Sequence, residues 1–208
     1  MSEARERTPD DEPVPVLAEQ PPLRRRAAAR AVARSVAATA GLLARRRIRQ
    51  PGARVGVVVQ FADGSAARVY RETVVPRPRT EDPAVLVVEF RLRGVRGRGH
   101  ALFRAESLLN TPLFVGFPGF VSKLWLAHDE HGAYRGLYEW DGPGLADAYV
   151  RALWWVLSLV SVRGSIHYAV LPGIRRDDLL DDPGVLDRAR PASLRDWWRP
   201  TQVEPAPG

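Results

Sequence analysis

The segment that most constrains the fold is residues 116–141, GFPGFVSKLWLAHDEHGAYRGLYEWD. It holds two apolar, aromatic-rich stretches of strand length, separated by the polar turn DEHG at residues 129–132. A short polar loop that ends in glycine between two such stretches is typical of a β-hairpin. An apolar pattern of helical length follows over residues 145–162. These features predict a core built on an antiparallel strand pair with a helix next in the chain.

Four strand patterns and two helix patterns occupy residues 84–172. Strands are predicted over residues 84–92, 120–128, 133–140 and 165–171, and helices over residues 100–115 and 145–162. This β-α-β-β-α-β order is that of a ferredoxin-like sandwich, in which two helices cover one face of an antiparallel sheet. The predicted fold class is therefore α+β.

The segments outside this unit have distinct compositions. Residues 1–23 are rich in charge and proline, so we expect disorder. Residues 24–50 mix alanines with arginines and predict a basic helix. Residues 54–83 predict a β-hairpin followed by a proline-rich linker, and residues 173–208 form a mixed-charge tail.

The positive charge of the chain is concentrated in one segment. The formal net charge is +7, yet residues 24–49 hold nine arginines and no acid. Removing these nine charges leaves −2 for the remainder, which argues against a nucleic-acid-binding body. Three interpretations of the basic segment stay open: contact with an anionic membrane, contact with nucleic acid, or a solvated extension.

Composition also restricts the chemistry and the expected location of the protein. The chain has no cysteine, which excludes disulfides and thiolate chemistry. It has no apolar run of the roughly 20 residues that span a bilayer, and its first twenty residues lack the apolar stretch of a signal peptide. We therefore expect a cytoplasmic location. Lys123 is the only lysine and Asn110 the only asparagine, which indicates a GC-rich coding sequence such as that of an actinobacterium.

The even number of residues in the hairpin loop predicts which side chains share a sheet face. One face holds Phe120, Ser122, Leu124, Leu126, Arg135, Leu137 and Glu139; the other holds Val121, Lys123, Trp125, Tyr134, Tyr138 and Trp140. We expect the first, mostly aliphatic face to pack under the helices. The aromatic face then suits a subunit interface or a ligand pocket, and we predict a homodimer.

Residues 118–125 have the pattern PGF-x-SK-x-W, and GAYRGLYEWD and a predicted helix containing ADAY follow in the chain. This series resembles the antibiotic-biosynthesis-monooxygenase-like branch of the dimeric α/β-barrel superfamily. The resemblance spans residues 84–172. It implies a homodimer with apposed sheets and a small organic molecule held between sheet and helices. Some such proteins oxidise polycyclic phenols with molecular oxygen and no metal or flavin; others degrade haem.

The resemblance thus implies a cofactor-independent monooxygenase acting on an aromatic or polyketide-like substrate. The alternative is a non-catalytic ligand-binding or interaction protein on the same scaffold. We expect no cofactor and no metal, with haem as a less favoured option.

Three residues are candidate catalytic groups. The resemblance implies an asparagine and a tryptophan in the pocket, types that Asn110 and Trp125 supply. His167, on a strand, is the candidate base. His128 and His131 flank a turn without further metal ligands nearby, so we expect them to be solvated.

Candidate substrate-binding residues are Tyr138, Trp140, Lys123, Glu89 and His100. The aromatic rings stack a planar ligand in one interpretation and are ordinary core or interface residues in the other. Glu89 and Lys123 are expected on one face, as a proton-transfer pair or as an ion pair. His100 opens a predicted helix, as a base or haem ligand or as a surface histidine.

Overall fold

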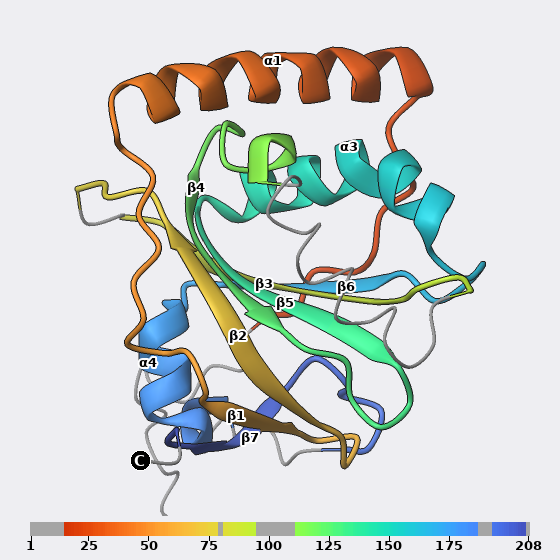
Figure 1. The fold of residues 1–208 in the computed structure, drawn as a ribbon. Coiled ribbons are helices and arrows are strands. Elements are labelled where there is room, and N and C mark those ends of the chain that lie inside the picture. The colour runs from red at the N-terminus through yellow and green to blue at the C-terminus, as the bar shows by residue number, and fades with distance from the viewer. Residues whose placement is uncertain (1–14, 79–80, 95–110, 187–192, 207–208) are drawn as a thin grey trace, which may run out of the picture.

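The computed structural model describes residues 15–78, 81–94, 111–186 and 193–206, arranged as in Figure 1. Its strands form one antiparallel sheet of seven in the order β6-β3-β5-β4-β2-β1-β7. Their bounds are β1 Val58–Phe61, β2 Ala66–Val74, β3 Pro83–Arg91, β4 Phe120–Leu126, β5 Ala133–Asp141, β6 His167–Pro172 and β7 Pro200–Glu204.

The predicted α+β class is confirmed, and the strand order β6-β3-β5-β4 is that of a ferredoxin-like sheet. Helix α3, Pro143–Val160, lies between β5 and β6 in the chain and begins with Pro143, whose fixed φ suits a first helical position. The helix predicted over residues 100–115 lies mostly outside the described residues. Its described end forms the 3₁₀ helix η2, Thr111–Leu113.

Helix α1, Arg25–Ala44, lies as an outer layer over α3, and both helices are on the same side of the sheet (Figure 1). Its inner face buries Ala28, Ser35 and Thr39, whereas all nine arginines of residues 24–49 are exposed. A main-chain hydrogen bond of 3.1 Å from Leu23 to the carbonyl of Arg151 on α3 anchors the start of the helix. The basic segment is therefore packed on one side and solvated on the other.

The structure inverts the predicted assignment of the two sheet faces. The aromatic face, with Trp125, Tyr138 and Trp140, packs under α3 and against Phe114. The prediction that the aliphatic face lies under the helices is wrong, because Leu124 and its neighbours are covered by the opposite layer. That layer contains β1, β7, α4 (Arg176–Asp181) and the 3₁₀ helix η3 (Pro183–Leu186).

Two terminal segments pack on the sheet in ways that the sequence pattern does not indicate. In the first, which belongs to the segment expected to be disordered, Leu17 forms an antiparallel bridge with Val170 of β6. The main-chain nitrogen of Gln20 donates to the hydroxyl of Tyr168 at 2.6 Å. In the second segment, within the expected tail, Leu179 and Trp198 are buried in the core on the aliphatic face of the sheet.

The aromatic face that motivated the predicted homodimer is covered by elements of the same chain. The homodimer stays a prediction.

No helix in the described ranges is both long enough and apolar enough to cross a membrane.

Candidate ligand-binding site

Strands β2 and β4 bring two cationic side chains together on the buried aromatic face. The register pairs Arg71 with Trp125 and Thr73 with Lys123, and β5 places Tyr138 on the other side of Lys123. An irregularity of β2 between Val69 and Arg71 puts Arg71, rather than Tyr70, opposite Trp125. We call Arg71, Thr73, Phe114, Lys123, Trp125 and Tyr138 the cationic–aromatic cluster.

Both cations lie against the same indole. Lys123 Nζ is 3.2 Å from the ring centroid of Trp125, and Arg71 Cζ is 3.8 Å from it. The rings of Phe114 and Tyr138 lie 4.6 and 4.8 Å from Lys123 Nζ. Such contacts with ring faces are attractive for a cation, more so where water is excluded.

A hydrogen bond orients the indole of Trp125, and a glycine makes room for the ring of Tyr138 next to it. Trp125 Nε1 donates to Thr73 Oγ1 at 3.1 Å, which satisfies the buried indole N–H. Gly136 pairs with Trp125 across the β4–β5 ladder, and a Cβ there would lie 2.6 Å from Cε2 of Tyr138. The glycine therefore makes room for the Tyr138 ring beside Trp125.

The electrostatics of the cluster favour either the binding of an anion or the neutral form of the Lys123 amine. Burial lowers the pKa of Lys123 well below its usual value, and the neighbouring charge of Arg71 lowers it further. Burial also lowers the pKa of Arg71. Among the residues that the structure describes, Lys123 makes no ion pair with a carboxylate. An anion bound here would be attracted by both cations.

Two tyrosine hydroxyls complete the polar groups at this site. Tyr149 on α3 donates to the Tyr138 hydroxyl at 3.2 Å. Burial raises the pKa of both phenols, so both are protonated at neutral pH. The Tyr138 hydroxyl accepts from Tyr149, which leaves its own proton available to an acceptor in the cluster.

Other predicted site residues lie elsewhere. Trp140 is fully buried in the core, with its ring centroid 4.8 Å from that of Tyr149. His167 is half-exposed on the edge strand β6, with Nδ1 3.5 Å from a carboxylate oxygen of Glu19. Strands β3 and β5 separate β6 from β4, a distance of about 14 Å at 4.8 Å per strand. The structure therefore does not bring His167 and Trp125 together, and Asn110 and His100 lie outside the described residues.

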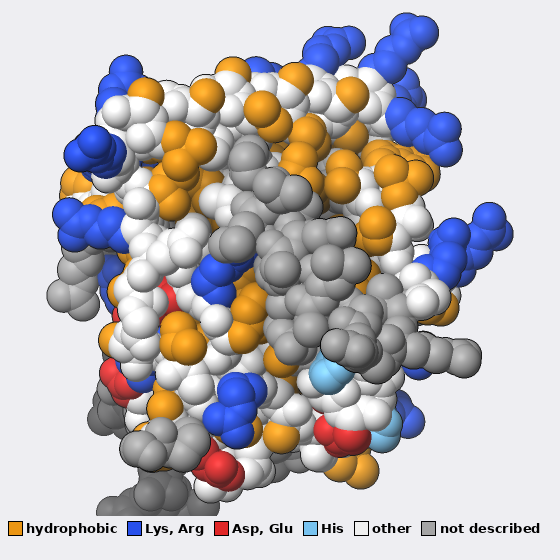
Figure 2. All heavy atoms as spheres, in the orientation of Figure 1, with side chains coloured by type: hydrophobic (Ala, Val, Ile, Leu, Met, Phe, Trp, Pro, Cys, Tyr) orange, Lys and Arg blue, Asp and Glu red, His pale blue; other side chains and the backbone are white. Residues whose placement is uncertain are grey.

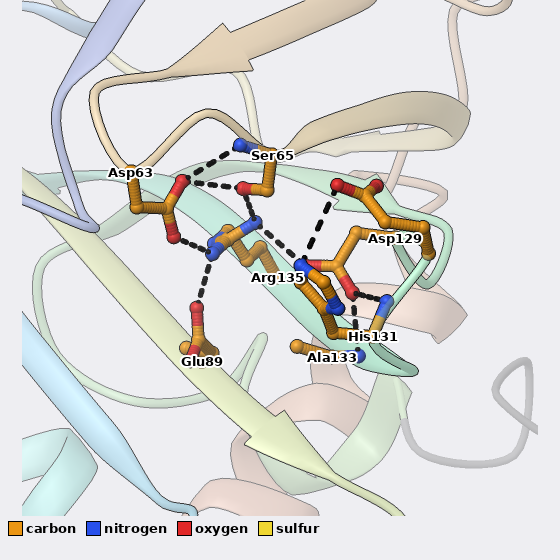
Figure 3. A network of polar contacts seen from close by, with 8 residues as sticks. Asp63, Ser65, Glu89, Asp129, His131, Ala133 and Arg135 are labelled. Atoms are coloured by element: carbon orange, nitrogen blue, oxygen red, sulfur yellow. Dashed lines mark hydrogen bonds and ion pairs between the residues drawn. The ribbon is translucent and has the colours of Figure 1, made fainter. Parts of the chain in front are cut away.

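Glu89 faces the opposite side of the sheet from Lys123, so the expectation that they share a face is wrong. The β3–β5 register pairs Glu89 with Arg135, and their side chains approach to 2.5 Å between Glu89 Oε2 and Arg135 Nη2 (Figure 3). The same guanidinium contacts Asp63 Oδ2 at 2.7 Å and Asp129 Oδ2 at 3.1 Å. Burial raises the pKa of Glu89 despite the opposing effect of Arg135, and the charges of Asp63 and Asp129 raise it further.

Ion pairs neutralise buried arginines on that second face. The Ser65 hydroxyl accepts from Arg135 Nη1 at 2.6 Å, so Arg135 ties the β1–β2 turn to the β4–β5 turn. Arg176, buried at the start of α4, contacts Glu72 of β2 at 2.6 Å. These pairs fasten turns and α4 to the sheet, and we assign them a structural role.

Among the described residues there is no group of three His, Cys, Asp or Glu side chains arranged to hold a metal ion. His131 is exposed beside Glu130, and His128 lies against the ring of Tyr134. These two histidines and His167 all lie outside the cationic–aromatic cluster.

Sequence reasoning grouped Lys123, Trp125 and Tyr138 but missed Arg71 and Thr73. The alternation of β2 gave no signal for them, because the irregularity before Arg71 shifts the residues that follow to the other face. The one local sequence feature that indicated this site was the lysine on the aromatic face, Lys123.

Comparison with known proteins gives structural neighbours only. Neither the models of protein families nor the curated proteins match this chain. A ferredoxin-fold protein related to antibiotic biosynthesis monooxygenases, from Listeria monocytogenes 4b F2365, is 13% identical, with a TM-score of 0.38 over 66% of this chain and 88% of that one. A haem-degrading enzyme from Listeria monocytogenes is 13% identical, with a TM-score of 0.37 over 59% and 95%.

An anthrone oxidase-like protein is 11% identical, with a TM-score of 0.37 over 53% of this chain and 55% of that chain. Monooxygenase-like ferredoxin-fold proteins are thus among the structural neighbours. At these identities and TM-scores, the neighbours carry no information on the function of this chain.

Proposed function

We propose that this protein binds a small aromatic anion, a phenolate or an aromatic carboxylate, at the cationic–aromatic cluster. The observation that carries the proposal is the position of Lys123 and Arg71 at 3.2 and 3.8 Å from one buried indole. Among the described residues Lys123 has no carboxylate partner; burying such a cation is costly, and a bound anion would offset that cost.

The second face of the sheet supplies an internal reference. Arg135 and Arg176 are as deeply buried as Lys123, yet each is held by carboxylates within 3.1 Å. The chain therefore neutralises buried cations where they only support the fold. Lys123, in contrast, makes no ion pair with a carboxylate of the described ranges. This difference supports a role for its charge or its free amine in binding.

The remaining members of the cluster fit the aromatic part of such a ligand. The ring of Trp125 lies against both cations, and the rings of Phe114 and Tyr138 lie within a few ångströms of Lys123. Aromatic side chains favour planar partners, and the Tyr138 hydroxyl offers a hydrogen bond to an anionic oxygen. A planar anion would satisfy both chemistries together.

A second candidate function, cofactor-independent oxygenation, is favoured by the lowered pKa of Lys123. A neutral amine in a dry site can take the proton of a bound phenol, while Arg71 stabilises the resulting phenolate. The phenolate then supplies electrons to molecular oxygen. In the overall reaction a ring CH₂ becomes a carbonyl, with one oxygen atom entering the substrate and the other leaving as water with the two hydrogens.

The binding proposal is tested by titrating the protein with 1-naphthoate and with the uncharged 1-naphthalenemethanol, following tryptophan fluorescence and thermal stability. We expect naphthoate to bind more tightly and Lys123→Met to weaken it by about tenfold, the effect of losing one charge-assisted contact. Arg195→Met removes an exposed cation of the C-terminal segment and should leave binding unchanged. Equal affinities for the two probes, or equal effects of the two variants, would refute the proposal.

The oxygenase candidate is tested separately with anthrone as the probe. We expect one molecule of oxygen consumed for each anthrone oxidised, and loss of this activity in Lys123→Met. Tight naphthoate binding without oxygen uptake on anthrone would leave the non-catalytic ligand-binding function and rule out this oxygenase chemistry.

A further inference from the structure

The start of α1 and the end of α3 meet at one corner of the molecule. Trp155 Nε1 donates to the carbonyl of Leu23 at 2.7 Å, which joins the two helices there. The guanidinium of Arg25 lies over the Trp155 ring, with Cζ 4.8 Å from its centroid. Arg25 is therefore held beside the last turns of α3 while its charge stays exposed.

Aliphatic side chains project from this corner. The exposed fractions of Leu159, Val160 and Val162 are 76%, 47% and 38%. Singly exposed aliphatic residues are common on protein surfaces, but three within four positions form a contiguous apolar feature.

Arg93, just beyond the end of β3, borders these residues. The main-chain nitrogen of Arg93 donates to the carbonyl of Val160 at 2.8 Å, and that of Val162 donates to the carbonyl of Arg91 at 2.8 Å. Arg93 Nη2 also donates to the carbonyl of Ser161 at 3.0 Å. We call Arg25, Arg93, Leu159, Val160 and Val162 the corner patch.

The two sequence segments that supply most of the corner patch carry no acidic residue. Residues 24–49 contain no acid, and residues 148–176 contain none either. Figure 2 shows Lys and Arg side chains projecting along α1 with hydrophobic side chains between them, whereas the acidic side chains visible among the described residues lie in the lower half of the view.

We propose that the corner patch docks on the surface of an anionic lipid bilayer. Aliphatic side chains flanked by arginines suit the interface between headgroups and acyl chains, where Leu159 would insert and the arginines would contact lipid phosphates. Binding to nucleic acid would make use of the arginines but leave Leu159, Val160 and Val162 without a role. A symmetric contact between two copies through this patch would oppose arginines to arginines.

The test is co-sedimentation of the full chain with vesicles of phosphatidylcholine alone and of phosphatidylcholine with an equal amount of phosphatidylglycerol. We expect binding to the anionic vesicles only, and weaker binding at high salt because the arginine–lipid attraction is screened. Leu159→Glu should weaken binding by about tenfold or more, since it removes the inserting side chain and adds a repelled charge.

The chain offers a matched control for this variant. Leu194, in the C-terminal segment, is exposed to a similar degree, 79%, so Leu194→Glu adds the same charge away from the corner patch. It should bind vesicles as the unmodified chain does. Arg25→Glu, a second variant of the patch, should weaken anionic binding and reduce its salt dependence.

Four results would overturn the proposal. They are no binding to either vesicle, equal binding to both, equal losses in Leu159→Glu and Leu194→Glu, and binding to duplex DNA at a salt concentration where anionic vesicles do not bind. Both leucines are exposed, so both variants should keep the melting temperature of the unmodified chain, and circular dichroism checks this directly.

Discussion

Gly116 offers the sharpest test of how α1 is attached to the rest of the molecule. A Cβ built on Gly116 would lie 1.9 Å from the carbonyl oxygen of Ser35 and 2.7 Å from Oγ1 of Thr39, both on α1. Carbon and oxygen approach to about 3.3 Å even in a favourable C–H···O contact. Gly116→Ala would therefore force the backbone of α1 away by more than about 1 Å, and no flexible side chain can absorb the change.

The cost follows from the packing. Overpacking of this kind costs about 1–3 kcal/mol, against a gain of about 0.4–1 kcal/mol from the stiffer unfolded chain. Complete undocking of α1 sets the upper limit. It would expose the half-buried Leu23, Val32, Leu42 and Ile48, worth about 3–6 kcal/mol if each contributes half of a fully buried aliphatic side chain.

We expect a net loss of about 1–2 kcal/mol, which lowers the melting temperature of a chain of this size by about 2–8 °C. The matched control is Gly144→Ala in the first turn of α3, where a Cβ meets no atom within 4 Å. It should raise stability slightly, because alanine is the better helix former. Hydrogen exchange should become faster in α1 in Gly116→Ala alone. Equal melting temperatures for the two variants, or unchanged exchange in α1, would refute the packing of α1 described above.

The remaining predictions concern buried charge. The pKa of Lys123 is lowered in the folded chain, so between this lowered pKa and 10.5 the unfolded chain binds more protons than the folded one. The free energy of unfolding should therefore rise with pH through this window. Urea unfolding should show the rise in the unmodified chain and not in Lys123→Met. The pKa of Glu89 is raised above 4.5, so its contribution should fall as pH rises through the window just above 4.5, and Glu89→Gln should flatten that fall. Arg135→Met leaves three carboxylates together and should cost about 3–5 kcal/mol at neutral pH, with much of the loss recovered in acid; a loss that does not depend on pH would contradict the network.

Local patterns predicted the elements of the ferredoxin-like sheet. The apolar runs around the DEHG turn became β4 and β5, and the apolar stretch predicted over residues 145–162 became α3, Pro143–Val160. These features depend on side chains within one element and on turn residues next to it, so sequence alone carries them. The parity argument also held for most of the hairpin, since Lys123 pairs with Tyr138 and Trp125 with Gly136.

The parity argument failed where the strands are irregular. The β4–β5 register shifts between Phe120 and Ser122, which moves Phe120 to the aromatic face and into contact with Trp140. The shift before Arg71 likewise brought a second cation to Lys123. A bulge adds one residue to one strand and leaves no mark in the hydrophobic pattern, so an analysis of alternation alone cannot locate it.

The inverted faces have a different cause, which lies in long-range pairing. The aliphatic face also carries Arg135, Glu139 and Glu72, and each of these charged residues is buried and paired there. Their partners are Asp63 and Asp129 for Arg135, Arg176 for Glu72, and both Arg175 and Arg176 for Glu139. These partners come from turns and from a helix far away in sequence, and α4 belongs to a segment that reads as a tail. Once such partners exist, a polar residue is no longer evidence of an exposed face, whereas a lysine among aromatic rings with no acidic partner in the described ranges still requires an explanation. The unpaired charge of Lys123, rather than the number of aromatic residues around it, is therefore the feature that marks the candidate site.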